Sequence, residues 1–207
     1  MADFSLQGMI NWAVEWCNKP NVGYSMTWKY RNMGLKDGYI TCFDCSSFTF
    51  FAIWLGGGYN VGTLGYKTDL EKYRTMEGQD GYNAWDVSWM RKALPYIGFE
   101  KLPYVPDVWK PGDILVKLHK HTEICYASPR ITMGAHNDGY ALPQQVSINT
   151  WNTDASYYDE VWRYTNGEEP IIPPAPPDPL NPPDPGGDTR PKKMPICMMT
   201  KPWWKKI

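Results

Sequence analysis

A proline-dominated stretch from residue 167 to residue 191 sets the limit of what this chain can fold into. It contains Pro-Pro-Ala-Pro-Pro-Asp-Pro at 173–179 and Asn-Pro-Pro-Asp-Pro-Gly-Gly at 181–187. Proline has no backbone N–H and fixes φ, so such a run favours extended polyproline II over helix or sheet. We therefore predict a folded domain at 1–166, an extended linker at 167–191 and a short separate segment at 192–207.

The chain before the linker divides into helices followed by strands. Apolar residues at helical spacing come first, and short runs of strand character bounded by turn residues come after them. The predicted helices cover 3–18 (capped by Asp3), the run after Asp44 and 84–96, with polar loops at 18–38 and 59–82 between them. The predicted strands cover 113–118, 121–127, 131–136, 144–148 and 159–164. This order predicts an α+β domain in which the helices and an antiparallel sheet are segregated.

Cys45 follows an aspartate at the start of an apolar helical run. We expect Asp44 to cap this helix by accepting a backbone N–H from its first turn. The positive end of the helix then lies beside Cys45, and its field favours the thiolate, which is the nucleophilic form of cysteine. With a histidine in reach, Cys45 would suit covalent catalysis; without one, it would be an ordinary small core residue.

Two histidines stand beside the turn that precedes the predicted strand 121–127. Alternation along this strand puts His121, Glu123 and Cys125 on one face of the sheet. A histidine at the start of a strand can face a helix N-terminus packed on that sheet, so His121 is the candidate base. His119 is the second choice of base, and its other interpretation is a partly exposed hairpin residue.

A third histidine ends the next predicted strand. His136 would lie beside His121 on a neighbouring antiparallel strand and accept the second N–H of its imidazole. Such a contact fixes the tautomer and stabilises the charged ring. Asn137 is the alternative orienting group, and a structural surface histidine is the other interpretation of His136.

The five cysteines are odd in number and scattered, which does not predict a disulfide framework. Cys42 and Cys45 form a Cys-x-x-Cys pair, for which redox chemistry is one interpretation and zinc binding with Cys125 and His121 is another. The pair lacks a thioredoxin-like strand-then-helix context and has no second Cys-x-x-Cys partner. We therefore expect a reduced pair and no metal or other cofactor.

Charge and hydropathy exclude several classes of partner. The formal net charge is −1, whereas phosphate binding needs clustered lysine and arginine, so we expect no nucleic-acid partner. No apolar run is long enough to span a membrane. The N-terminus also lacks the basic-then-apolar pattern of a signal peptide, so we expect no export through a classical signal.

The C-terminal segment 192–207 is basic, rich in methionine and contains Trp203 and Trp204. Apolar anchors flanked by lysines are typical of a peptide that docks in a groove of a partner. An anionic wall polymer or a membrane surface is the alternative partner. A disordered tail without a role is the third interpretation.

The order of these motifs resembles that of the NlpC-type papain-like cell-wall cysteine peptidases, and most closely the subgroup of bacteriophage peptidoglycan hydrolases. Three segments carry the resemblance, which covers roughly residues 5–165: Tyr24-Ser25-Met26, Asp44-Cys45-Ser46-Ser47 and His121-Thr122-Glu123-Ile124-Cys125-Tyr126. The family usually has glycine just before its histidine and often a small residue two positions after it. Here those positions hold Lys120 and Glu123.

The resemblance implies a papain-like core in which a helix carries the cysteine and a sheet carries the histidine. Carried over to this chain, it implies Cys45 as the nucleophile and His121 as the general base. It further implies His136 as the third polar group and the Tyr24 hydroxyl as a ligand of the oxyanion.

The activity that the resemblance implies is metal-independent cleavage of an amide in bacterial peptidoglycan, either as an N-acetylmuramoyl-L-alanine amidase or as a stem-peptide endopeptidase. A non-catalytic wall-binding or structural module of a phage particle is the alternative function, and a transferase of the same fold is a third. The linker and the segment 192–207 favour docking on a phage tail or baseplate protein. Release from the host at lysis is the other expected route to the wall.

Overall fold

The structure is a computed structural model that describes residues 4–75, 86–150, 155–167 and 169–172. The chain divides into two units, Met1–Pro174 and Ala175–Ile207. Residues 168 and 173–191 of the predicted linker and the whole of the C-terminal segment 192–207 lie outside the described residues.

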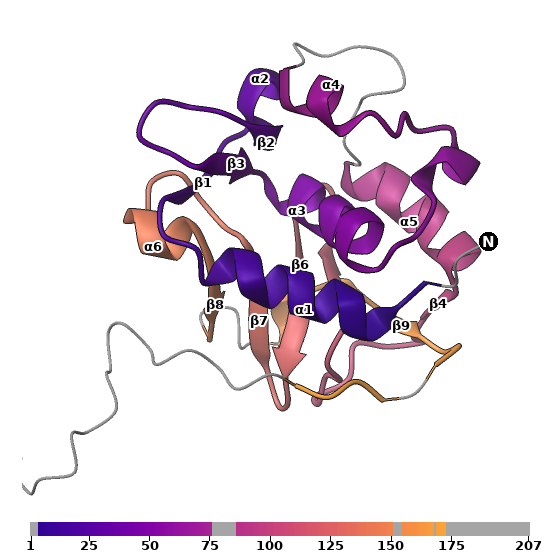
Figure 1. Cartoon of the computed structure of the whole chain (residues 1–207). Helices are drawn as coiled ribbons and strands as arrows, with labels where there is room; N and C mark the ends of the chain where they lie inside the picture. Colours follow the sequence, from indigo (N-terminus) through magenta and orange to yellow (C-terminus); the bar gives the residue numbers. More distant parts are fainter. Residues whose placement is uncertain (1–3, 76–85, 151–154, 168, 173–207) are drawn as a thin grey trace, which may run out of the picture. The chain divides into compact units, whose positions relative to one another are not determined.

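The described part of the first unit is an α+β fold with two sheets (Figure 1). The smaller sheet has the strand order β1-β3-β2, and the larger, antiparallel sheet has the order β4-β9-β5-β6-β7-β8. The strands are β1 (Val22–Tyr24), β2 (Asn32–Gly34), β3 (Thr41–Phe43), β4 (Phe99–Lys101), β5 (Ile114–Lys117), β6 (His121–Ala127), β7 (Ile131–Ala135), β8 (Val146–Asn149) and β9 (Glu160–Tyr164). The helices are α1 (Leu6–Cys17), α2 (Trp28–Arg31), α3 (Cys45–Phe51), α4 (Leu70–Thr75), α5 (Val87–Ile97) and α6 (Leu142–Gln145). A π-helical turn (Ala52–Gly56) extends α3, and short 3₁₀ turns cover Val61–Leu64 and Ala155–Tyr157.

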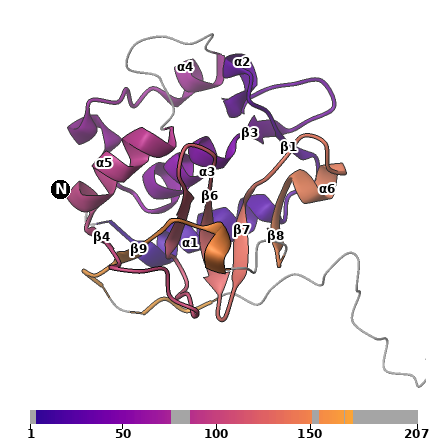
Figure 2. The ribbon, with the colours of Figure 1, turned by 180° about the vertical axis from the view of Figure 1, so that it is seen from behind.

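Helices α1 and α3 pack on one face of the larger sheet. Helix α3 contacts β6 and β7, and α1 contacts β7 and β8. Figure 2 shows this arrangement from behind, with β6, β7 and β8 in front of the two helices. The main apolar core lies between these layers, where burial of apolar surface stabilises the fold. Its fully buried side chains include Met9, Ile10, Ala13, Phe48, Phe51, Ile114, Val116, Ile124 and Met133.

A second apolar cluster covers the other side of the larger sheet. It consists of Trp109, Leu115, Cys125, Tyr158 and Val161. Along β6, Ile124 belongs to the main core and Cys125 to the second cluster. The predicted alternation of β6 between two faces is therefore confirmed, and the strand is buried on both sides.

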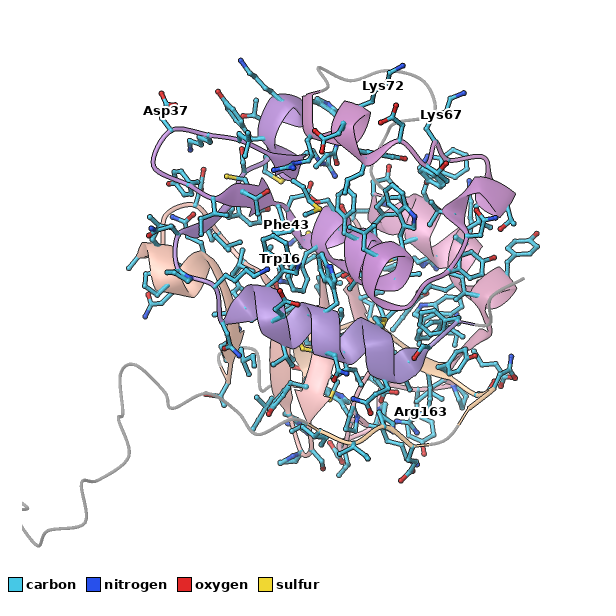
Figure 3. All side chains as sticks on the ribbon, viewed as in Figure 1. Trp16, Asp37, Phe43, Lys67, Lys72 and Arg163 are labelled. Carbon is cyan, nitrogen blue, oxygen red and sulfur yellow. The ribbon has the colours of Figure 1, made fainter. Side chains whose placement is uncertain are left out.

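Aromatic side chains join α1, β3 and α3. The Trp16 and Phe43 rings, labelled in Figure 3, lie 5.5 Å apart between centroids in an edge-to-face arrangement. Phe43 also packs edge-to-face on Phe48, with 5.4 Å between centroids. Aromatic pairs of this geometry add about 0.5–1.5 kcal/mol beyond their area burial. They fix the segment that leads from β3 into α3, which is the segment that carries Cys45.

Several predicted elements differ from the observed ones. Ser5, whose hydroxyl accepts the Gly8 N–H at 3.0 Å, caps α1, so the assignment of the cap to Asp3 was wrong; Asp3 itself lies outside the described residues. The predicted loops at 18–38 and 59–82 contain β1, α2, β2, a 3₁₀ turn and α4, and β4 was also missed. These pieces are three to six residues long, which is too short for a hydrophobic period to appear.

Within the described ranges, no helix combines the length and the apolar character needed to cross a membrane.

Candidate active site

Cys45 is the first residue of α3, and Asp44 caps this helix as predicted. The Asp44 carboxylate accepts the backbone N–H of Ser47 at 2.7 Å. The Ser47 hydroxyl in turn accepts the backbone N–H of Asp44 at 2.9 Å, which completes a capping box. The cap fixes the first turn of α3, so the position of the Cys45 sulfur is set by the local sequence around it.

Arg31, from α2, clamps the same turn from the side. Its guanidinium forms an ion pair with Asp44 and donates to the Ser46 hydroxyl at 3.1 Å. Its backbone carbonyl accepts a hydrogen bond from the Ser47 hydroxyl. Arg31 and Asp44 are both buried, at 7 % and 1 % exposed. A buried charge needs a partner of opposite sign, so each of the two holds the other in place.

His121 lies at the start of β6, directly after a tight hairpin turn. It is the residue of β6 that pairs with Lys117 of β5, at the last position of the ladder before the turn. Asp159 holds this turn, because its carboxylate accepts from the Lys117 ammonium at 3.1 Å and from the Leu118 backbone N–H at 2.8 Å. His121 lies close enough to Cys45 for the two side chains to interact, and this interaction raises the pKa of His121. The structure thus brings together two residues that are far apart in the chain.

Glu123 is fully buried and connects the two histidines. One of its carboxylate oxygens, Oε1, accepts from His121 Nε2 at 2.9 Å and from His136 Nδ1 at 2.9 Å. The other oxygen accepts from the Tyr158 hydroxyl at 2.8 Å. Because Nε2 of His121 is engaged by Glu123, Nδ1 is the nitrogen left to face Cys45. His121 therefore lies between Cys45, with which it interacts, and the buried Glu123 carboxylate, to which it is hydrogen-bonded.

Burial and charge act in opposite directions on this chain. Burial alone would lower the pKa of His121, but hydrogen bonds and charge interactions with Cys45 and Glu123 outweigh it and raise that pKa to about 10. Burial alone would raise the pKa of Glu123, yet the hydrogen bonds from His121 and His136 hold it well below its usual range. The arrangement therefore favours a carboxylate beside an imidazolium.

His136 comes directly after β7, the strand that neighbours β6, and its ring lies 6.4 Å from that of His121 between centroids, so its predicted place beside His121 is confirmed. However, Glu123 rather than His136 takes the second nitrogen of His121, so the prediction of a direct contact was wrong. His136 binds the same carboxylate oxygen from the other side, and the amide of Asn149 lies 2.8 Å from its Nε2. A carboxylate is the stronger acceptor for an imidazolium, which explains the order of this chain.

The two second-choice residues lie away from the chain of hydrogen bonds. Asn137 accepts the Gly139 backbone N–H at 2.8 Å and is exposed, and Asn149, not Asn137, is the asparagine beside His136. His119 is exposed and has a φ of 59°, in the left-handed region of a tight turn. His119 is therefore an exposed residue of the hairpin turn, which was the other interpretation of this histidine.

Tyr24 lies close to Cys45 because β1 pairs with β3 in parallel, with Tyr24 opposite Phe43. Burial, followed by the charges of Cys45 and Asp44, raises the pKa of Tyr24, so its hydroxyl stays protonated. That hydroxyl donates to the Met26 sulfur at 2.9 Å. A thioether is a weak acceptor, so the hydroxyl is available to a stronger one.

A pocket of about 230 Å³ opens beside this arrangement. His121 and His136 form one wall, and three tyrosines with Lys120 and Asn137 form the rest; the tyrosines are Tyr24, Tyr140 and Tyr157. Cys45 is 6 % exposed, and its charge contributes to the raised pKa of Tyr157, after burial and Glu123. The sulfur therefore lies close to the residues that line the pocket.

His121, Glu123 and His136 are also the one group among the described residues whose donor atoms would suit a metal ion, since they lie within 4.8 Å of one another. In the structure the two ring nitrogens lie 2.9 Å from the shared carboxylate oxygen. That spacing is the length of a hydrogen bond. A divalent ion would have to displace the proton between His121 Nε2 and Glu123 Oε1 and the proton between His136 Nδ1 and the same oxygen.

The alternative zinc site at Cys42, Cys45, Cys125 and His121 is not assembled. Cys125 lies in the second apolar cluster, whereas Cys42 is buried in β3. Cys42 and Cys45 are free cysteines.

Comparison of the chain with family models, with curated proteins and with solved structures gave no match.

Two residues of the site were missed from the sequence. Glu123 was placed on the face of His121 by alternation, but it was treated only as a departure from the family pattern. The signal was present, because a carboxylate two residues from a histidine on one strand is within reach of its ring. Arg31 gave no such signal, since its partner Asp44 lies on a different element.

Proposed function

We propose that this protein is a cysteine hydrolase of bacterial peptidoglycan with a papain-like core, in which Cys45, His121 and Glu123 act as a triad. The position of His121 between the Cys45 side chain, with which it interacts, and the buried Glu123 carboxylate, to which it is hydrogen-bonded at 2.9 Å, carries the proposal. A nucleophile, a base and an orienting group in this order are the elements that acyl transfer requires.

In the proposed reaction, the Cys45 thiolate attacks the carbonyl carbon of an amide in the wall. The carbonyl electron pair moves to oxygen, and the backbone N–H of Cys45 and the Tyr24 hydroxyl stabilise that oxyanion. To do so, the Tyr24 hydroxyl exchanges the Met26 sulfur for the charged oxygen. The cap at Asp44 leaves the Cys45 N–H at the positive end of α3.

His121 then donates its proton to the leaving nitrogen as the C–N bond breaks. The products of this half are a free amine and a thioester on Cys45. A water molecule gives a proton to His121 and attacks the thioester, which releases a carboxylic acid and restores the pair. Glu123 keeps the imidazole in one tautomer throughout, since Nε2 stays bonded to its carboxylate.

Mass spectrometry of purified peptidoglycan fragments tests this function. The wild-type protein is expected to produce a new amine and a new carboxyl group, while Cys45→Ala and His121→Ala, both folded by circular dichroism, produce none. Free muramic acid lactyl groups would identify the amidase, which is the activity we propose first. Shortened stem peptides would identify the endopeptidase. Hydrolysis by a folded Cys45→Ala protein would refute the proposal. If the wild-type protein binds the fragments without cleaving them, the result would favour a wall-binding module. If it joins fragments to one another, the result would favour a transferase.

A chelator separates this mechanism from metal-assisted hydrolysis. We expect hydrolysis to continue at an unchanged rate in millimolar EDTA, because the proposed steps use only protein groups. Loss of activity in EDTA that zinc restores would instead assign His121, Glu123 and His136 to a metal ion.

We further propose that the protein acts on the wall from a virion tail, with the segment 192–207 docked on a tail or baseplate protein. The paired Trp203 and Trp204 between lysines support this proposal. Deleting residues 192–207 should abolish incorporation into particles and leave hydrolysis intact. Unchanged incorporation would favour a lysin released at lysis.

A further inference from the structure

The pocket beside His121 has an unusual balance of charge. Among the described residues that line it, Lys120 is the one with a fixed charge, and none has a carboxylate. The Glu123 carboxylate behind the wall is fully buried and already accepts from His121 and His136. The exposed Asp138, which follows Asn137 and is not a lining residue, contributes to the raised pKa of Tyr24. The fixed charge on the lining itself is therefore positive, in a protein whose formal net charge is −1.

Lys120 is held at the rim by its backbone. Its N–H donates to the Lys117 carbonyl at 3.1 Å, and Asp159 fixes both Lys117 and the Leu118 N–H in the same turn. The left-handed φ of 59° at His119 gives the turn its shape. The pocket edge that carries Lys120 is thus built by the hairpin that also positions His121.

The ammonium group of Lys120 is not committed to a protein partner. Its side chain forms no hydrogen bond or ion pair with any part of the chain that the structure describes, and it only interacts at longer range with Asp159. Both oxygens of Asp159 are occupied, one by the Lys117 ammonium and one by the Leu118 N–H. A lysine beside a pocket without a carboxylate partner is suited to an anionic ligand.

The other lining groups add hydrogen-bond donors. Burial raises the pKa of Tyr157, so its phenol stays neutral and can donate to an anion. The single hydroxyl proton of Tyr24 is the one that the proposed reaction uses for the oxyanion.

One buried amide, Gln145, orders the wall of the pocket. Its side-chain oxygen accepts the Tyr24 backbone N–H at 2.9 Å, and its side-chain NH₂ donates to the Tyr140 backbone carbonyl at 2.9 Å. Its backbone carbonyl accepts the His136 backbone N–H at 2.8 Å. The wall is therefore pre-organised, which lowers the entropy cost of binding.

We infer that this pocket binds a free carboxylate of the substrate, with Lys120 as its cationic partner. The inference rests on the proposed function and narrows it: the preferred substrate is an acidic wall peptide with a carboxylate close to the scissile amide. The corresponding peptide in which that carboxylate is amidated is a poor substrate, because an amide gives Lys120 no opposite charge.

The test uses two synthetic muropeptides that differ only in one group, a free carboxylate or a carboxamide on the residue next to the scissile bond. Wild type is expected to cleave the acid form with a kcat/KM about tenfold higher or more, mainly through KM, as one such charge pair predicts. Lys120→Gln should lose this preference, and Lys120→Arg should keep it. Lys92→Gln, which removes the same charge from an exposed position of α5, is the matched control and should behave as wild type.

Binding of both peptides to the Cys45→Ala protein, measured by calorimetry, gives a readout that does not depend on hydrolysis. A preference for the acid form there, lost on adding Lys120→Gln, supports the pocket even where cleavage is absent, and absent cleavage would refute the hydrolase alone. Equal affinity for both peptides, or a preference that survives Lys120→Gln, would overturn the inference while leaving the hydrolase untouched.

Discussion

His121 Nε2 lies 2.9 Å from Glu123 Oε1, a carboxylate with no exposed surface. This contact joins residues two apart on one face of β6, so the strand alone sets their spacing. The second nitrogen of the same ring stays available to Cys45, the first residue of α3, whose side chain interacts with His121. The geometry of the candidate site is thus determined by one strand and one helix N-terminus, with His136 and Tyr158 supporting Glu123.

Glu123→Gln is expected to lower kcat for wall hydrolysis on the order of 10²- to 10⁴-fold. An amide offers the imidazolium no charge and can present its NH₂ to Nε2, which favours the wrong tautomer. Tyr158→Phe, which removes the hydrogen bond to the other carboxylate oxygen, is the control and should lose far less. Steady-state kinetics on a soluble wall peptide measure both. A greater loss from His136→Asn than from Glu123→Gln would return the orienting role to His136.

The free energy of unfolding should fall both as the pH becomes alkaline and as it becomes acidic. The pKa of His121 is raised from 6.5 to about 10, so its contribution is complete below pH 6.5 and declines as the pH rises towards 10. The pKa of Glu123 is lowered below 4.5, so its contribution is complete above pH 4.5 and declines as the pH falls. Urea unfolding from pH 3 to 10 should therefore show His121→Gln with a flatter alkaline limb and Glu123→Gln with a flatter acid limb. If both variants lost stability with pH in the same way as wild type, the pKa shifts of His121 and Glu123 would not contribute to stability as described.

Arg31→Ala should destabilise the fold by about 3–5 kcal/mol, because it leaves the buried Asp44 carboxylate without its cation. Urea denaturation measures this loss. The matched control is Lys110→Ala, which breaks an exposed ion pair with Glu169 and should cost less than about 1 kcal/mol. Equal losses for the two variants would mean that the clamp on the first turn of α3 has little energetic weight.

Much of the site was accessible from the sequence because its signals are local. The cap at Asp44 is read from a residue type before an apolar run, and the face of His121 from alternation along one strand. The position of His136 on the adjacent strand followed from a short hairpin. In each case the separation of the residues along the chain determines where they lie relative to one another in the fold.

The rest depends on pairings that leave no local pattern. Tyr24 comes near Cys45 through a parallel pairing of β1 with β3, each three residues long. Arg31 meets Asp44 across two elements, and Tyr158 reaches Glu123 from 35 residues away. These distant partners decide whether Glu123 is an exposed acid or a buried carboxylate bonded to both histidines. The sequence pattern of β6 alone therefore did not assign its role.

The rate at which Cys45 reacts with iodoacetamide, followed by peptide mapping, tests the central claim that Cys45 and His121 act as a pair. The account predicts fast alkylation of Cys45 at pH 5.5 in wild type, at least tenfold slower alkylation in His121→Ala, and no reaction of buried Cys42 in either protein. Alkylation of Cys45 that is slow at pH 5.5 and unaffected by His121→Ala would contradict it.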